Sequence, residues 1–137
     1  MISKLDDDAI QSLMEQAFMA QNGISRICFH PAGSLHFQCM LIAFRPSLSY
    51  PVISDNLPGQ ILFVCIRGSL TLSSYCDNGY LQTSTMLMAG EALSLPRSTY
   101  RSTYSHSEGS VFLEVIDGPF EPSLRRYLDQ IQPSNLT

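Results

Sequence analysis

The chain has few charged residues and no long apolar run, and these two features bear on which partners it can bind and on whether it can span a membrane. Only 15% of its 137 residues are charged, and eight Lys and Arg face twelve Asp and Glu, which gives a formal net charge of −4. Because the few cations are scattered along the chain, they argue against a nucleic acid or an anionic membrane surface as a partner. No segment approaches the ~20 consecutive apolar residues that a membrane span requires.

Histidine and paired cysteines are also scarce. The three histidines are His30, His36 and His106, and the four cysteines at positions 28, 39, 65 and 76 show no C-x-x-C spacing. A structural zinc site is therefore not expected. The first residues lack the basic head and apolar run of a secretory signal, so we expect a cytoplasmic protein whose reduced thiols mainly fill the core.

One helical pattern is present near the N-terminus. Ile10, Leu13 and Ala17 share a helical face, and the acidic residues 6–8 precede them where the helix dipole favours anions. Asn22 and Gly23 supply a left-handed stop. These features predict one amphipathic helix within residues 1–23.

From Ile24 onward the pattern becomes typical of strands. Short runs rich in β-branched and aromatic residues alternate with turn residues, as in an all-β sandwich or barrel. The Asn78-Gly79 pair predicts a tight hairpin. The predicted strands are residues 25–30, 37–44, 61–66, 69–75, 81–86, 92–95, 101–104 and 111–116.

A second helix is predicted after the strands. Leu124, Tyr127, Leu128 and Ile131 recur at helical spacing between Ser123 and Pro133. We therefore expect one domain, with a helix in residues 1–23, a barrel in residues 24–122, and a helix and tail in residues 123–137.

Two segments resemble the paired motifs of the cupin superfamily, namely residues 63–72 and residues 90–101. Beyond them, residues 24–122 resemble the WbuC-type cupins, which are often encoded among bacterial surface-polysaccharide genes. Arg26, Phe29-His30, Arg67-Gly68, Leu95-Pro96 and the segments 38–46, 49–51, 77–79 and 112–120 carry this likeness. It implies a mainly β, single-domain cupin (a double-stranded β-helix or jelly-roll barrel) with a helix at each end.

The metal ligands of these relatives have no counterparts in the chain. Counting back from Gly68 puts Ile61 at the position of the carboxylate, and Arg101 takes the place of the histidine in the second motif. The pair of histidines expected soon after Tyr50 is replaced by residues 51–56. We therefore expect no metal and no other cofactor.

Arg101 and Glu114 are the main candidates for chemistry. Arg101 takes a position that points into the barrel of the relatives, and its guanidinium group suits a carboxylate or phosphate. It either clamps an anionic ligand or pairs with a carboxylate such as Glu114. Glu114 lies in an apolar run, where it is either a structural partner or a general acid or base with a raised pKa.

Five further residues are candidate ligand contacts. Arg26, His30 and Gln38 lie on early strands and either line the pocket rim or serve structure alone, while Tyr50 and Gln60 flank the place of the missing histidine pair. Asp55 and Asn56, between them, fit an ordinary surface loop.

These observations leave three hypotheses for function. The first is a metal-free cupin that binds a small polar or anionic molecule, in a carbohydrate or nucleotide-sugar context implied by the resemblance. The second is a sugar isomerase or epimerase that uses His30 and Glu114 for proton transfer. The third is a decayed barrel that acts as a dimerising or interaction module. A homodimer is expected because Leu62, Val64 and Ile66 form a second apolar face on one strand.

Overall fold

The computed structural model describes residues 4–30 and 36–128. Its first element is the α-helix α1 (Asp7–Met19), which begins where the Asp6 side chain accepts a hydrogen bond from the Ala9 N–H. Ile10, Leu13 and Ala17 are the buried face of this helix, as the sequence predicts. Gly23 has a φ of 76° and lies in the turn after the helix, beyond its end at Met19.

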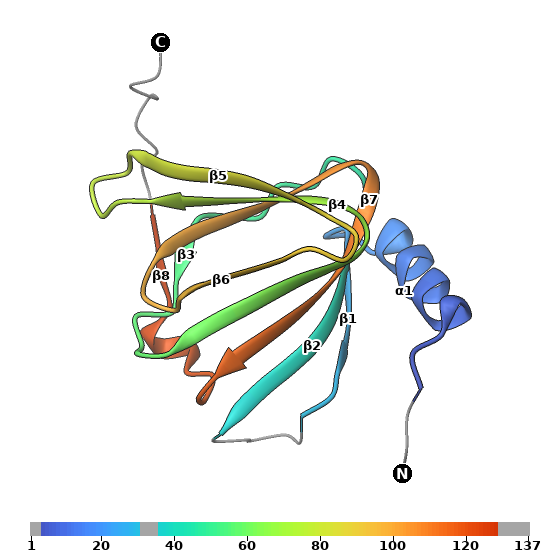
Figure 1. Ribbon diagram of the computed structural model, residues 1–137, viewed down its shortest axis with the longest axis horizontal. Coiled ribbons are helices and arrows are strands. Elements are labelled where there is room, and N and C mark those ends of the chain that lie inside the picture. Colours follow the sequence, from blue (N-terminus) through green and yellow to red (C-terminus); the bar gives the residue numbers. More distant parts are fainter. Residues whose placement is uncertain (1–3, 31–35, 129–137) are drawn as a thin grey trace.

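Eight strands follow in the described part of the chain, and every pairing between them is antiparallel. They enclose a barrel with α1 on its outside (Figure 1). The strands are β1 (Ile24–Cys28), β2 (Phe37–Phe44), β3 (Ile53–Ser54), β4 (Gln60–Tyr75), β5 (Leu81–Met88), β6 (Ala92–Pro96), β7 (Tyr100–Asp117) and β8 (Arg126–Tyr127).

Two long strands, β4 and β7, belong to both walls of the barrel. The first half of β4 and the second half of β7 form one wall with β1, β2 and β6, while their other halves form the second wall with β3, β5 and β8. The sequence predicts each of them as two separate strands. Gly68 and Gly109 explain the difference, because both have positive φ and let the chain bend without ending the strand.

The two glycines meet at this bend. A Cβ on Gly68 would lie 2.1 Å from the carbonyl oxygen of Gly109, so the two strands approach too closely there for any other residue. We call this part of the barrel the bend end. In Figure 1 it lies beside α1, and β3 and β8 lie at the opposite end.

Two apolar clusters hold these layers together. The larger one lies between the walls and includes Phe44, Phe63, Leu70 and Phe112. The smaller one lies outside the first wall, where α1 packs on Leu41, Ala43 and Val111. On the outer face of β4, Leu62 and Ile66 stay 38% and 37% exposed.

The C-terminal helix predicted from Ser123 does not form over residues 123–128. Pro122–Leu124 is a single 3₁₀ turn, and β8 pairs with β3 through Ile53↔Tyr127 and Ser54↔Arg126. An isolated helix of two turns is marginal in water, whereas the free edge of β3 offers hydrogen-bond partners. Residues 129–131 of that predicted helix lie outside the described residues.

None of the helices in the described part of the chain is long and apolar enough to cross a membrane.

Candidate functional site

A cavity of about 480 Å³ lies between the two walls of the barrel. This is within the size range of pockets that bind small molecules. Side chains from β1, β2, β4 and β7 line it, and Pro119, Phe120, Glu121 and Arg125 add a further side from the segment after β7.

The strand register explains which predicted residues reach the cavity. Gln38 is paired with Ile116, Met40 with Glu114, and Arg26 with Ile42, so these side chains share one face of the sheet. Six of the seven candidate residues line the cavity: Arg26, His30, Gln38, Tyr50, Arg101 and Glu114.

Gln60 is the exception. Its neighbour Ile61 is fully buried, and because side chains alternate along a strand, Gln60 faces outward. It is exposed and accepts a hydrogen bond from the Ser94 hydroxyl at 3.3 Å. The prediction that Gln60 contacts a ligand in the cavity is therefore wrong.

Arg101 projects from the second wall and is 4% exposed. Its Nη2 atom lies 3.3 Å from Oδ1 of Asp55, and its Nη1 donates to the carbonyl oxygen of Arg97 at 3.4 Å. Its ion-pair partner is thus Asp55, where the sequence suggested a carboxylate such as Glu114.

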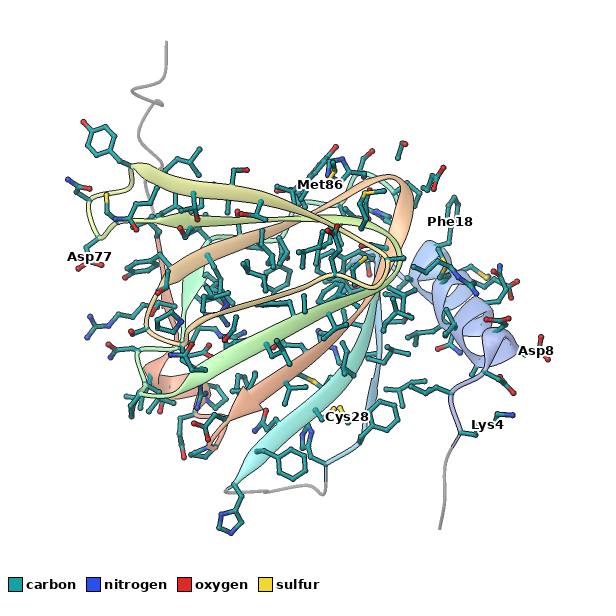
Figure 2. All side chains as sticks on the ribbon, viewed as in Figure 1. Lys4, Asp8, Phe18, Cys28, Asp77 and Met86 are labelled. Atoms are coloured by element: carbon teal, nitrogen blue, oxygen red, sulfur yellow. The ribbon has the colours of Figure 1, made fainter. Side chains whose placement is uncertain are left out.

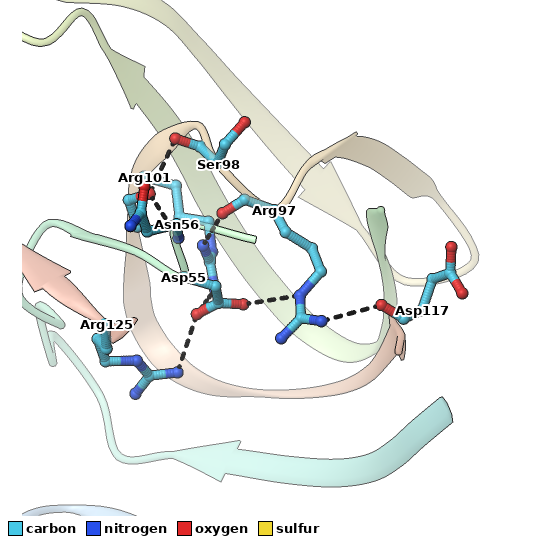
Figure 3. A network of polar contacts seen from close by, with 8 residues as sticks. Asp55, Asn56, Arg97, Ser98, Arg101, Asp117 and Arg125 are labelled. Carbon is cyan, nitrogen blue, oxygen red and sulfur yellow. Dashed lines mark hydrogen bonds and ion pairs between the residues drawn. The ribbon is translucent and has the colours of Figure 1, made fainter. Parts of the chain in front are cut away.

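Asp55 is the centre of a buried ionic cluster (Figure 3). Besides Arg101, its carboxylate accepts from Nε of Arg97 and from Nη2 of Arg125, each at 3.3 Å. Only 2% of Asp55 is exposed, so the interpretation of this residue as part of a surface loop is wrong. We call these four residues the arginine cluster, and the part of the barrel that holds them the arginine end.

Backbone contacts fix Asp55 and Arg97 in this cluster. The Asp55 N–H donates to the carbonyl oxygen of Arg97 at 3.0 Å, and the Ser54 hydroxyl donates to that of Ser98 at 2.9 Å. Arg97 also donates from Nη1 to the backbone oxygen of Asp117 at 3.0 Å. Figure 3 shows Asp55 between Arg97 and Arg125, with Arg97 also bonded to the backbone of Asp117.

The arginine cluster carries an excess of positive charge, because three guanidinium groups share one carboxylate. Within the described residues, Nη2 of Arg97 and Nε of Arg125 are buried without a hydrogen-bond partner. Burial lowers the pKa of Arg101, although the charges of Asp55 and Glu114 oppose that shift. A buried cation of this kind is stabilised by any further anion that can reach it.

Glu114 lies on the first wall, opposite Met40 on β2 and Phe63 on β4. Burial raises the pKa of its carboxyl above the ordinary value of 4.5, and the charge of Arg101 only partly opposes this. No hydrogen bond or ion pair joins its carboxyl to any residue in the described part of the chain. The group therefore remains available to a molecule in the cavity.

His30 lies just beyond the end of β1 and is half-buried. Nδ1 of its ring lies 3.1 Å from the Cys39 nitrogen and 3.2 Å from the Cys39 carbonyl oxygen, so whether Nδ1 accepts or donates depends on the tautomer of the ring. His30 thus serves the backbone and lines the cavity at once.

Aromatic side chains dominate the deep part of the cavity. Phe44 and Phe112 contact edge to face with ring centroids 5.1 Å apart, and Phe63 lies 6.1 Å from Phe112. Tyr50 stacks on Phe44 at 6.1 Å. Near the arginine end, the guanidinium carbon of Arg125 lies 5.0 Å from the ring centre of Phe120.

The residues of the cavity do not suit a metal ion. No three His, Cys, Asp or Glu side chains come together within residues 4–30 and 36–128. Arg101 places a cation on the wall of the cavity, and Nδ1 of His30 is bonded to the backbone. The expectation of a metal-free protein remains a prediction.

Comparison with protein-family models and with curated proteins gives no match. Solved structures do match. An RmlC-like cupin protein from Desulfovibrio desulfuricans is 19% identical over 68% of this chain and 81% of its own, with a TM-score of 0.55. A conserved protein of unknown function from Streptococcus pyogenes is 14% identical over 87% and 90%, with a TM-score of 0.63.

Oxalate decarboxylase from Bacillus subtilis also matches, at 17% identity and a TM-score of 0.62, over 77% of this chain but only 27% of its own. At such low identities the likeness establishes the fold alone. The chain forms an antiparallel barrel in which β4 and β7 belong to both walls, and the solved structures that match it include cupins. The chain therefore has the cupin fold, in a single small, mainly β domain.

Proposed function

We propose that this protein binds a small anionic molecule in the cavity, with Arg101 as its main anchor. One observation carries the proposal: Arg101 lines the cavity and belongs to a buried cluster in which three guanidinium groups share one carboxylate. A guanidinium group has five donors in a planar fork, so its bonds to Asp55 and Arg97 leave donors for a ligand.

The other polar lining residues are suited to orient such a ligand. Gln38, Tyr50 and His30 provide uncharged hydrogen-bonding groups, and Glu114 provides a carboxyl without a partner in the described residues. The cavity of about 480 Å³ also counts against a barrel filled by its own side chains. A decayed barrel that serves only as an interaction module is therefore the weaker hypothesis.

The biological context rests on the resemblance to WbuC-type cupins. It supports a bacterial, cytoplasmic protein in carbohydrate or nucleotide-sugar metabolism. A homodimer belongs to the same proposal, since Leu62 and Ile66 leave apolar surface on the outer face of β4. A monomeric mass in sedimentation at micromolar concentration would count against the dimer.

Glu114 favours a second candidate, a metal-free sugar isomerase or epimerase. Its unpartnered carboxyl and its raised pKa are properties of a general acid or base, and His30 lines the same cavity. Deuterium exchange from solvent into a bound ligand would support this activity if it is lost in Glu114→Gln. If a ligand binds but no deuterium exchanges into it, the isomerase or epimerase hypothesis is refuted and the binding function remains.

A thermal-shift screen tests the binding proposal. The panel holds sugar phosphates, nucleotide sugars, simple carboxylic acids, their neutral analogues and divalent metals. An anion at 100 times its Kd adds about 2.7 kcal/mol to the stability of the folded state. We expect this shift in the wild type and in Arg67→Gln, which removes an arginine outside the barrel that pairs with Asp7, and its loss in Arg101→Gln.

Arg101→Lys covers the case in which Arg101→Gln does not fold, since it keeps the charge but not the fork. We expect this variant to show a smaller shift than the wild type. Equal shifts in all variants, or equal shifts with neutral analogues, would refute Arg101 as an anchor. Stabilisation by one equivalent of a divalent metal would point to metal binding instead.

A further inference from the structure

We infer that the ligand is a small carboxylic acid with an apolar body, whose carboxylate meets the arginine cluster and whose body extends toward the bend end. The inference rests on the proposed function and narrows its ligand class. It disfavours a free sugar or sugar acid, which would bring hydroxyl groups along its whole length.

The lining residues change in polarity along the cavity. On β2 the inward-facing side chains run from Gln38 through Met40 and Ile42 to Phe44, and all four line the cavity. Phe44 is paired with Ser110, next to the bend at Gly109, whereas Gln38 is paired with Ile116 near the far end of β7. Polarity thus decreases from the arginine end toward the bend end.

The deep part of the cavity offers few partners to a hydroxyl group. Phe44, Phe63 and Phe112 contact one another there, and Ile42 extends the same surface. Thr103 supplies a hydroxyl on the opposite wall, and Tyr50, which stacks on Phe44, supplies another. A sugar placed there would bury several hydroxyl groups without partners, and each such loss weakens binding. An alkyl or aryl group instead gains from leaving water.

The charges at the arginine end suit a single negative charge. Three guanidinium groups share Asp55, and the charge of Glu114 acts on Arg101 and Arg125, so even with both carboxylates ionised one positive charge stays unmatched. Arg26 and Glu121 also line the cavity, but both are exposed, so water screens their charges. Arg125 lines the cavity as well, and within the described residues its Nε is buried without a hydrogen-bond partner.

Three probes of equal chain length separate the parts of this inference. Hexanoate has the carboxylate and the apolar body, gluconate has the same carboxylate on a hydroxylated chain, and hexan-1-ol lacks the charge. We expect calorimetry to show that hexanoate binds at least about tenfold more tightly than either of the others. From butyrate to hexanoate, each added methylene should improve Kd by about fourfold.

Two pairs of variants localise the two ends of the ligand. Arg125→Gln should weaken the binding of hexanoate by about tenfold or more. Arg126, on β8, is the exposed neighbour of Arg125, and Arg126→Gln should leave the Kd for hexanoate unchanged. Met40→Gln should weaken the binding of hexanoate and remove the gain in affinity for each methylene added from butyrate to hexanoate. Met86→Gln should not, because Met86 is 54% exposed on the outside of the barrel, as Figure 2 shows.

Each outcome has a distinct meaning. Tighter binding of gluconate than of hexanoate overturns the apolar body but leaves anion binding intact. Equal binding of hexan-1-ol and hexanoate, with no effect of Arg125→Gln, overturns the role of charge in binding. Absence of binding by all three probes overturns the choice of an apolar carboxylic acid, and a shift with another anion in the thermal-shift panel would then leave the proposed function standing. Hexyl phosphate tests the head group, and stronger binding of it than of heptanoate would overturn the choice of a carboxylate.

Discussion

The two ends of the barrel are stabilised in different ways. At the bend end, Gly68 and Gly109 bring β4 and β7 together above an apolar cluster that includes Phe44 and Phe112. At the arginine end, Asp55 holds three arginines from two distant segments through ion pairs of 3.3 Å. The bend end depends on shape, and the arginine end depends on charge.

This difference separates structural from functional residues. The aromatic residues toward the bend end contact one another and carry no charge that needs a partner. The arginine cluster is left with an excess of positive charge, and Glu114 is left without a hydrogen-bond partner among the described residues. Natural proteins accept such incomplete arrangements mainly where a ligand completes them.

Asp55→Asn should have the largest effect on stability. The substitution leaves three buried guanidinium groups without their shared carboxylate, and loss of one partner from a buried ion pair costs about 3–5 kcal/mol. Urea denaturation measures the loss. Asp77→Asn, in the exposed β4–β5 hairpin labelled in Figure 2, is the control and should change stability by less than about 0.5 kcal/mol. Equal effects would mean that the cluster does not hold its end of the barrel.

Gly68→Ala tests the bend end in the same way. Its Cβ would lie 2.1 Å from the Gly109 carbonyl oxygen, whereas a Cβ on Gly90 would meet nothing within 4 Å. Both glycines have positive φ, at 73° and 91°, so both variants share a backbone strain of about 1–2 kcal/mol. We expect Gly68→Ala to cost about 1–3 kcal/mol more than Gly90→Ala in the same assay. Similar losses would show that the strands can separate at the bend without cost.

Glu114 should make stability depend on pH. Because burial raises its pKa in the folded state, the folded state binds the proton more tightly than the unfolded state does. The stability of the wild type should therefore fall, relative to Glu114→Gln, as the pH rises above 4.5 and through the folded-state pKa. The steepest slope is about 1.4 kcal/mol per pH unit.

Urea denaturation at several pH values from acid to neutral checks this slope. Glu15→Gln, on the exposed side of α1, is the control for the loss of one carboxyl elsewhere. Parallel curves for the wild type and Glu114→Gln would contradict the prediction. A ligand carboxylate beside Arg101 should change the slope, which would link this titration to the cavity.

Local pattern was sufficient to predict most of the fold. β2 occupies residues 37–44 as predicted, because its side chains alternate between two buried surfaces. The sequence pattern predicted strand ends near Gly68 and Gly109, where β4 and β7 in fact continue through a bend. In sequence, a glycine that bends a strand looks the same as one that ends it. It also missed β3 and β8, which have two residues each and are too short to show a period.

The candidate site was less predictable, because its charges pair over long distances in the sequence. Asp55 contacts arginines that lie 42, 46 and 70 residues away, and no local signal connects them. Arg97 and Arg125 were therefore missed. Gln60 was predicted to face the cavity, but its neighbour Ile61 faces the interior of the barrel instead. An error of one residue along a strand is enough to reverse the direction of a side chain.

Arg125 also bears on the order in which a nascent chain can mature. A ribosome adds about 5–20 residues per second, so the 70 residues that separate Asp55 from Arg125 require roughly 4–14 s. During most of this interval β7 is still being made, so neither wall of the barrel is complete. The ion pairs of Asp55 with Arg97, Arg101 and Arg125 can therefore all be in place only after the long strands of both walls have been synthesised.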